Sequence, residues 1–130
     1  MPTIEGTTFA PSLGVDLAAS TKTASGMYYR DVTVGGGALL AAGHTIAIHY
    51  TGSLVDGTIF DINGPAAAPF SFVLGHGDVI AGFDEGMVGM HVGGVRQLII
   101  PPSLGYGGTT RGPIPANSIL VFTVSVVSSS

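Results

Sequence analysis

Apolar and polar residues alternate along several stretches of the chain, and this period of two predicts β-strands. The alternation is clean at 45–51, where Ile46, Ile48 and Tyr50 share one face. It is equally clear at 70–74, where Phe70 and Phe72 fall on the same side. The predicted strands cover residues 27–34, 45–51, 70–74, 95–100 and 118–127.

Only residues 81–88, with the sequence AGFDEGMV, predict a helix. Phe83 and Met87 lie four positions apart and can share one face of it. Glycines within the segment weaken its intrinsic helix propensity, so the helix must depend on packing. Together the strands and the helix predict an α+β fold. In it, one antiparallel sheet, apolar on its inner face, wraps around one short helix.

Residues 1–25 show no sustained period and predict an irregular N-terminal arm, packed through Phe9, Leu13 and Leu17. Residues 26–127 are expected to form one domain, which the length of 130 residues allows. The three serines at 128–130 are expected to be a disordered tail.

Composition narrows the range of functions. Charged residues make up only 9% of the chain, well below the usual ~25%. A net charge of -4 with four Lys and Arg residues argues against nucleic acid and against anionic membrane surfaces as partners. The absence of cysteine excludes disulfides and thiolate zinc sites, while 21 glycines and eight prolines favour a β-rich fold.

The compartment stays open. No basic segment followed by an apolar one comes after Met1, so no signal peptide is expected, and the apolar run 36–43 is too short to span a bilayer. The Ser/Thr-rich, Lys-poor start suits the mature part of an exported, periplasmic protein. Otherwise the chain is expected in the cytoplasm.

Several polar groupings are interpreted as structural. The triple glycine 35–37 lacks the Lys-Ser/Thr continuation of a phosphate loop. Asp84 and Glu85 are interpreted as the solvated face of the helix, near its positive end, and His49 as a structural residue on the face opposite Tyr50. No metal or cofactor is expected, because the histidines lack metal-site spacing: His44, His49, His76 and His91.

Seven segments occur in the order HYTG, DG, FD, PFSFVLG, DVIAGFDEGMVGMHVGG, IPPSLGYG and IPANSILVF. This order resembles the FKBP-type peptidyl-prolyl cis-trans isomerases, the immunophilins that bind rapamycin-type macrolides. The similarity runs from about residue 25 to residue 127. It implies a five- or six-stranded antiparallel sheet curled around one short helix, with a pocket between them.

The resemblance also implies an aromatic site. It gives catalytic roles to Tyr50, Phe60, Asp61, Tyr106 and Phe122. It gives substrate-binding roles to Phe70, Val79, Ile80, Phe83 and Ile114. Phe83 would form the floor, where the family most often has tryptophan. The N–H of Ile80 would bond a substrate carbonyl, and Ile114 would close the rim. Taken alone, Tyr50, Phe70 and Phe122 would be ordinary core residues.

Such a site needs no acid, base or metal. Rotation about an X-Pro amide breaks no bond and requires only the loss of C–N double-bond character.

The sequence departs from the family pattern at two places. Ala66 occupies a position where other members have a basic partner for the FD aspartate, so Tyr50 is the expected partner of Asp61. The 107–115 loop is about one residue short and lacks the family's histidine.

The leading hypothesis is an isomerase that acts on X-Pro bonds of polypeptides during protein folding. The resemblance implies proline-containing polypeptides and rapamycin-type macrolides as partners, and a monomer is expected. The alternative is a proline-peptide-binding or chaperone-like module with weak isomerase activity. A third hypothesis gives the N-terminal arm a contact with a partner protein.

Overall fold

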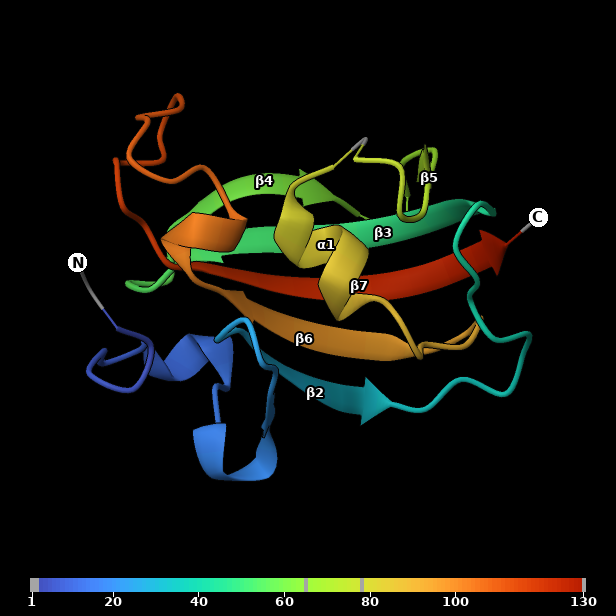
Figure 1. The fold of residues 1–130 in the computed structure, drawn as a ribbon, viewed down its shortest axis with the longest axis horizontal. Coiled ribbons are helices and arrows are strands. Elements are labelled where there is room, and N and C mark those ends of the chain that lie inside the picture. The colour runs from blue at the N-terminus through green and yellow to red at the C-terminus, as the bar shows by residue number, and fades with distance from the viewer. Residues whose placement is uncertain (1–2, 65, 78, 130) are drawn as a thin grey trace.

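The protein consists of one antiparallel sheet and one short α-helix, α1 (Ala81–Gly86) (Figure 1). The computed structural model describes residues 3–64, 66–77 and 79–129. Within these ranges no helix has both the length and the apolar character needed to cross a membrane. The strands are β1 (Thr21–Lys22), β2 (Tyr28–Thr33), β3 (Thr45–Leu54), β4 (Ile59–Asn63), β5 (Phe70–Val73), β6 (Val95–Ile100) and β7 (Leu120–Ser129).

The α+β class and the sheet on one helix are confirmed, but the sheet has seven strands rather than five or six. Its order is β1-β2-β6-β7-β3-β4, and β5 pairs with β3 beside β4. The additional strand is β1 in the N-terminal arm, where Thr21 pairs with Tyr29 and Lys22 with Tyr28. The residues expected to be an irregular arm therefore extend the sheet by one short strand.

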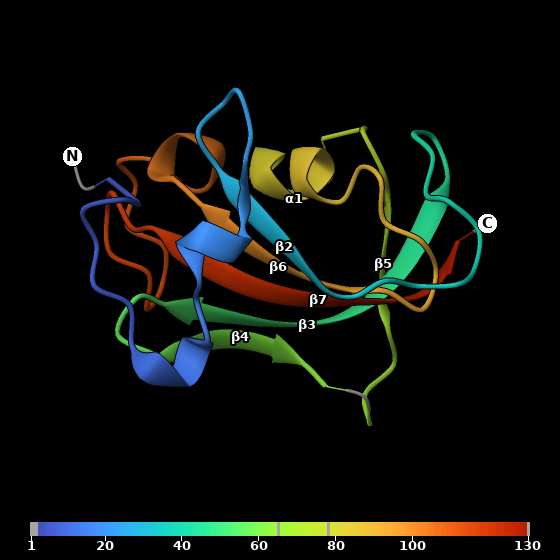
Figure 2. The same cartoon turned by 90° about the horizontal axis from the view of Figure 1, so that it is seen from below.

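Helix α1 lies against the concave face of the sheet (Figure 2). Glycines permit this close approach: a Cβ on Gly82 would lie 2.7 Å from Ile100, and one on Gly86 would lie 2.7 Å from the Cε of Met27. The same glycines that weaken the helix thus let it pack on the sheet. The helix ends at Gly86 rather than at Val88. Arg96 of β6 donates hydrogen bonds to the carbonyls of both residues, 2.9 Å each.

A bulge in the β3–β4 hairpin sets the directions of the Phe60 and Asp61 side chains. Gly52 pairs with Asp61, but the next residue, Ser53, pairs with Ile59, so Phe60 is the extra residue. An extra residue interrupts the alternation of side chains along a strand. Phe60 therefore packs on the inner core while Asp61 also reaches the cavity on that side.

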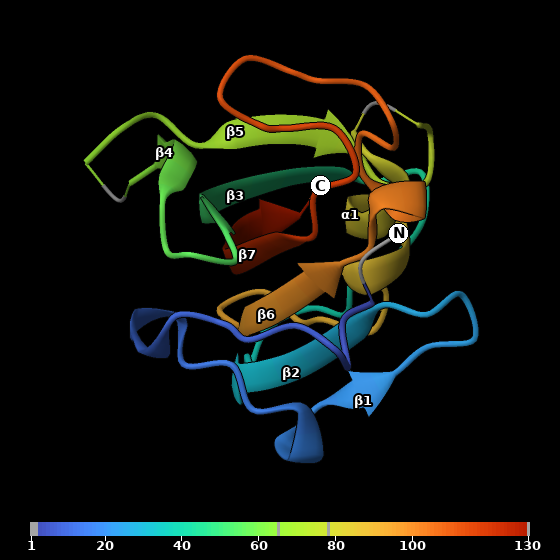
Figure 3. The ribbon, with the colours of Figure 1, turned by 90° about the vertical axis from the view of Figure 1, so that its left-hand side faces the viewer.

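The arm packs against one end of the outer face of the sheet (Figure 3). A second apolar cluster there joins Ile4 to Ile99 and Ile119, with Phe9 and Leu17 packed against it. Leu13 contributes its carbonyl, which accepts a 2.8 Å hydrogen bond from the side chain of Gln97. The predicted packing of Phe9 and Leu17 is confirmed. The arm also includes two short 3-10 helices, Pro11–Leu13 and Leu17–Ala19.

The expected disordered tail is wrong for Ser128 and Ser129. Both belong to β7, where Ser128 pairs with Ala47 and Ser129 with Ile46. Backbone ladders need no apolar side chain, and β3 offers partners along this whole length. Ser130 lies outside the described residues.

Candidate active site

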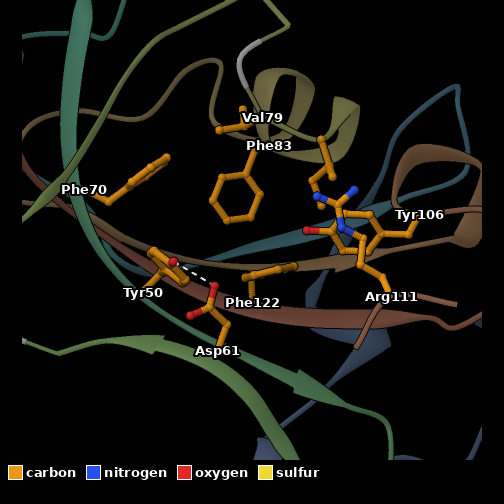
Figure 4. A pocket seen from close by; sticks show the side chains of 9 residues that line it. Tyr50, Asp61, Phe70, Val79, Phe83, Tyr106, Arg111 and Phe122 are labelled. Atoms are coloured by element: carbon orange, nitrogen blue, oxygen red, sulfur yellow. Dashed lines mark hydrogen bonds between the residues drawn. The ribbon is translucent and has the colours of Figure 1, made fainter. Parts of the chain in front are cut away.

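A cavity of about 470 Å³ opens between α1, the inner face of the sheet and the loop after β6 (Figure 4). Most of the side chains around it are aromatic or aliphatic. The lining residues are Tyr50, Asp61, Phe70, Val79, Ile80, Phe83, Tyr106, Arg111 and Phe122. The resemblance therefore located most of the cavity wall from sequence order alone.

Aromatic rings form the floor and walls. Phe83 from α1 and Phe122 from β7 meet edge to face, with centroids 4.6 Å apart and planes at 85°. Tyr50 from β3 lies 6.2 Å from each of them. Phe70 from β5 extends the wall, 6.1 Å from Tyr50. Edge-to-face rings hold one another in place, so the floor is firm before a ligand arrives.

Phe83 and Phe122 are each only 4% exposed, although both line the cavity. The structure thus places them in the apolar core as well as in the wall. Phe72 is likewise buried behind Phe70. The floor of the cavity therefore belongs to the apolar core, while its outer wall, which includes the exposed Phe70, is open to solvent.

Tyr50 and Asp61 form the polar corner of the cavity. The Tyr50 hydroxyl donates a 2.8 Å hydrogen bond to Oδ2 of Asp61 (Figure 4). This confirms the expected partner of Asp61. Partial burial, then the hydrogen bond and the nearby Asp61 carboxylate, raise the pKa of Tyr50 to about 12. The phenol therefore stays protonated at neutral pH and acts as a hydrogen-bond donor.

This raised pKa makes folding stability depend on alkaline pH. An unfolded tyrosine ionises near pH 10, so between about pH 10 and 12 the unfolded chain loses the proton first and stability falls as pH rises. Tyr50→Phe should show a smaller stability loss in that window. The difference between the ultraviolet absorbance titrations of the two proteins should show one phenol titrating near pH 12. A phenol titrating near pH 10 would contradict this account.

Two polar donors at the edge of the cavity have no partner in the described part of the chain. They are the backbone N–H of Ile80, which precedes α1, and the hydroxyl of Tyr106. Val79 lies beside Ile80 at this edge. Both donors are available to bond the carbonyl groups of a bound peptide.

Two of the predicted site residues do not line the cavity. Phe60 packs behind it, with its ring 5.5 Å from Phe122 and at 85° to it. Ile114 is 5% exposed and packs in the core, so its expected place at the rim stays a prediction. Arg111 lies at the cavity instead. The backbone of Arg111 bonds that of Ile114 in both directions, so the two residues close one tight turn.

Glu85 is exposed, as a solvated helix face requires, whereas Asp84 is half-buried, and both residues also have structural contacts. Asp84 accepts hydrogen bonds from the backbone N–H groups of Gly75 and Gly77, at 2.8 and 3.0 Å, and so holds the segment after β5. Glu85 accepts a hydrogen bond from Thr23 in the arm. His49, expected to be structural, contacts the Asn63 side chain through Nδ1 at 2.8 Å.

Comparisons with known proteins agree with this geometry. A sequence model of the FKBP-type peptidyl-prolyl cis-trans isomerase family matches residues 37–127. FK506-binding protein 3 of Candida albicans is 47% identical over 109 residues, which cover 83% of this chain and 25% of that protein. FK506-binding protein 2 of Dictyostelium discoideum is 49% identical over 87 residues, covering 66% of this chain and 65% of that protein.

Solved structures show the same fold. The crystal structure of AtFKBP13 superposes with a TM-score of 0.80 at 33% identity, covering 85% of this chain and 98% of the other. That of FkpA from Escherichia coli superposes with a TM-score of 0.79 at 35% identity, covering 86% of this chain and 52% of the other. The chain matches only 24 to 27% of the length of the first fungal relatives. By its sequence, its fold and its aromatic cavity, the chain belongs to the FKBP-type peptidyl-prolyl cis-trans isomerase family.

Proposed function

We propose that this protein accelerates cis-trans isomerisation of X-Pro peptide bonds in polypeptides, and that the cavity is its active site. One observation carries the proposal: a cavity with an apolar floor of Phe83 and Phe122 and with hydrogen-bond donors around it. A proline ring fits an apolar floor of this kind, and the donors match the carbonyls of the peptide on either side. Membership of the isomerase family supports the same activity.

The chemistry requires only rotation about one C–N bond. In water this rotation has a barrier of about 18–20 kcal/mol, because the planar amide has partial double-bond character. The planar form is also the more polar one and is stabilised by water. Moving the prolyl amide into the cavity removes that water, which favours the twisted transition state over the planar ground state. Each ~1.4 kcal/mol gained in this way speeds rotation about tenfold.

The polar groups have distinct roles in this proposal. The N–H of Ile80 holds a backbone carbonyl of the substrate next to the bond that rotates. The Tyr106 hydroxyl donates to a second carbonyl, and so keeps the chain on one side fixed while the other side turns. Asp61 is a positioning residue: it binds the Tyr50 hydroxyl and thereby fixes the ring that forms the wall. Phe60 supports Phe122 from behind.

The test is isomerisation of a Leu-Pro peptide, measured by a protease-coupled assay or by NMR exchange, with Tyr50→Phe, Asp61→Asn and the double variant. Each single change should lower kcat/KM about 3- to 20-fold, which corresponds to the loss of one solvent-exposed hydrogen bond of about 0.6–1.8 kcal/mol. The double variant should be little worse than Tyr50→Phe alone, because both changes act on the same contact. Additive losses would show that Asp61 acts independently of Tyr50.

A wild-type rate equal to the uncatalysed rate would overturn the isomerase proposal. The alternative, a proline-binding or chaperone-like module, requires that outcome together with tight binding of the same peptide. Nothing in the cavity favours it, since Phe83 provides an apolar floor although the family more often has tryptophan there.

We also propose that the cavity accepts macrolides of the FK506 and rapamycin type. The supporting observation is its aromatic lining, together with relatives that are named FK506-binding proteins. Such a ligand would compete with the peptide, so added FK506 should inhibit isomerisation. Inhibition should weaken when Tyr106 is replaced by phenylalanine, which keeps the ring and removes the donor.

A further inference from the structure

Arg111 is the one cationic side chain among those that line the cavity. Its backbone N–H bonds the carbonyl of Ile114 at 2.8 Å, and the N–H of Ile114 bonds its carbonyl at 2.9 Å. Because Ile114 is buried, it anchors this short turn in the core. The turn itself passes through Gly112, whose φ of 55° suits glycine. Arg111 thus stands on a fixed backbone although its own side chain is exposed.

The guanidinium group is also placed by a ring. It lies over Tyr106, 4.9 Å from the ring centroid, which is within the range of a cation–π contact. Figure 4 shows the pair on the side of the cavity away from Phe70, and Tyr106 itself is one of the edge donors. A substrate that accepts a hydrogen bond from Tyr106 would therefore pass next to Arg111.

The other cations of the described residues donate hydrogen bonds to oxygen atoms, whereas Arg111 contacts only the Tyr106 ring. Arg96 pairs with Asp31, Lys22 pairs with Glu5, and Arg30 donates to the carbonyl of Gly14. In residues 3–64, 66–77 and 79–129, no carboxylate or carbonyl group accepts a hydrogen bond from the Arg111 side chain. Its N–H donors remain open to a ligand. Asp61, the acidic residue among those that line the cavity, binds the Tyr50 hydroxyl instead.

We propose that Arg111 selects X-Pro substrates that carry an acidic side chain next to the proline. This inference rests on the proposed isomerase function and adds a charge preference to it. A guanidinium group binds a carboxylate through two parallel hydrogen bonds, and Tyr106 holds the group where such a side chain would leave the cavity. Aspartate or glutamate in the flanking residue is therefore favoured, and lysine is disfavoured.

The experiment compares kcat/KM for four peptides that differ only in the residue before proline: Leu, Gln, Glu and Lys. A second set places the same residues after proline. The wild type should prefer Glu over Gln about two- to tenfold in one of the two sets, the range expected for a partly exposed charged contact. The preference should fall towards one when salt is raised to about 1 M, because the Debye length shortens to about 3 Å.

Variants assign the preference to Arg111. In Arg111→Gln the Glu-to-Gln ratio should drop to about one, and Arg111→Lys should keep part of it as a point charge. Lys22→Gln is the matched control, because it removes one positive charge from the arm, far from the cavity lining. Its ratio should equal that of the wild type. The Glu-to-Gln ratio of kcat/KM is taken within each protein. A variant that lowers kcat/KM for every peptide equally therefore leaves this ratio unchanged.

The outcomes separate this inference from the isomerase proposal. If the wild type turns over Leu-Pro but treats Glu and Gln alike at low salt, the charge preference is wrong and the isomerase stands. A ratio that survives in Arg111→Gln also overturns it. If Leu-Pro is not turned over at all, the isomerase proposal fails. Affinities of the Glu and Gln peptides, measured by NMR titration, then decide the charge preference.

Discussion

Replacing Arg96 by methionine is expected to lower the free energy of unfolding by about 2–4 kcal/mol. Arg96 is buried on β6 and is the partner of both carbonyls at the end of α1, Gly86 and Val88. Its Nε and Nη2 also bond the two oxygens of Asp31, at 2.7 and 3.2 Å. Methionine keeps the apolar stem but leaves the helix carbonyls and the carboxylate without their donor.

The effect should extend to the active site, because α1 carries Phe83. A helix of six residues with two glycines has little stability of its own, so its position depends on packing and on the cap that Arg96 provides. We therefore expect kcat/KM on a Leu-Pro peptide to fall as well. Urea unfolding gives the stability change, and the rate assay is run well below the unfolding midpoint so that folded protein alone is compared.

Asp31→Asn separates the two parts of this contact. Asp31 lies on β2, and its side chain is 36% exposed, so its loss should cost much less than the loss of Arg96. The helix carbonyls keep their donor in this variant, and the isomerase rate should stay close to that of the wild type. Equal losses for the two variants would mean that the ion pair, and not the helix cap, stabilises the protein.

The sequence predicted the fold where one face of a strand or helix is buried and the other is not. Ile46 and Ile48 alternate with more exposed residues and were placed correctly on the inner face of β3. The strand β4 gave no such signal, because Ile59 and Ile62 are both exposed and the bulge at Phe60 breaks the period. The short strand β1 was missed for the same reason: both of its residues are exposed.

The order of the motifs predicted those site residues that lie on strands or on the helix. Tyr50, Phe83 and Phe122 sit on regular elements, so their positions follow from the fold. Arg111 and Ile114 sit in a loop, where no strand or helix period indicates which side chain enters the core. An apolar residue and an arginine at the ends of a tight turn favour the arrangement found here, with isoleucine inside and arginine at the cavity.

Gly52→Ala is expected to damage the active site more than any other single methyl group added to β3. A Cβ at this position would lie 2.6 Å from the Phe122 ring and 2.8 Å from the Phe60 ring. Phe122 cannot retreat, since its other side is in contact with Phe83 at 4.6 Å between centroids. We expect a stability loss of about 1–3 kcal/mol from overpacking, and a drop in kcat/KM of about tenfold or more as the floor shifts.

The expected loss in Gly52→Ala comes only from the steric clash of the added Cβ with the two rings. Gly52 does not have the positive φ that disfavours alanine, so the backbone accepts the substitution. Gly36→Ala is the matched control: it too lacks a positive φ, and no atom lies within 4 Å of the added Cβ. It should change neither stability nor rate measurably. Normal activity in Gly52→Ala would mean that Phe60 and Phe122 can move without loss, and hence that their fixed contact is not what shapes the cavity for a proline ring.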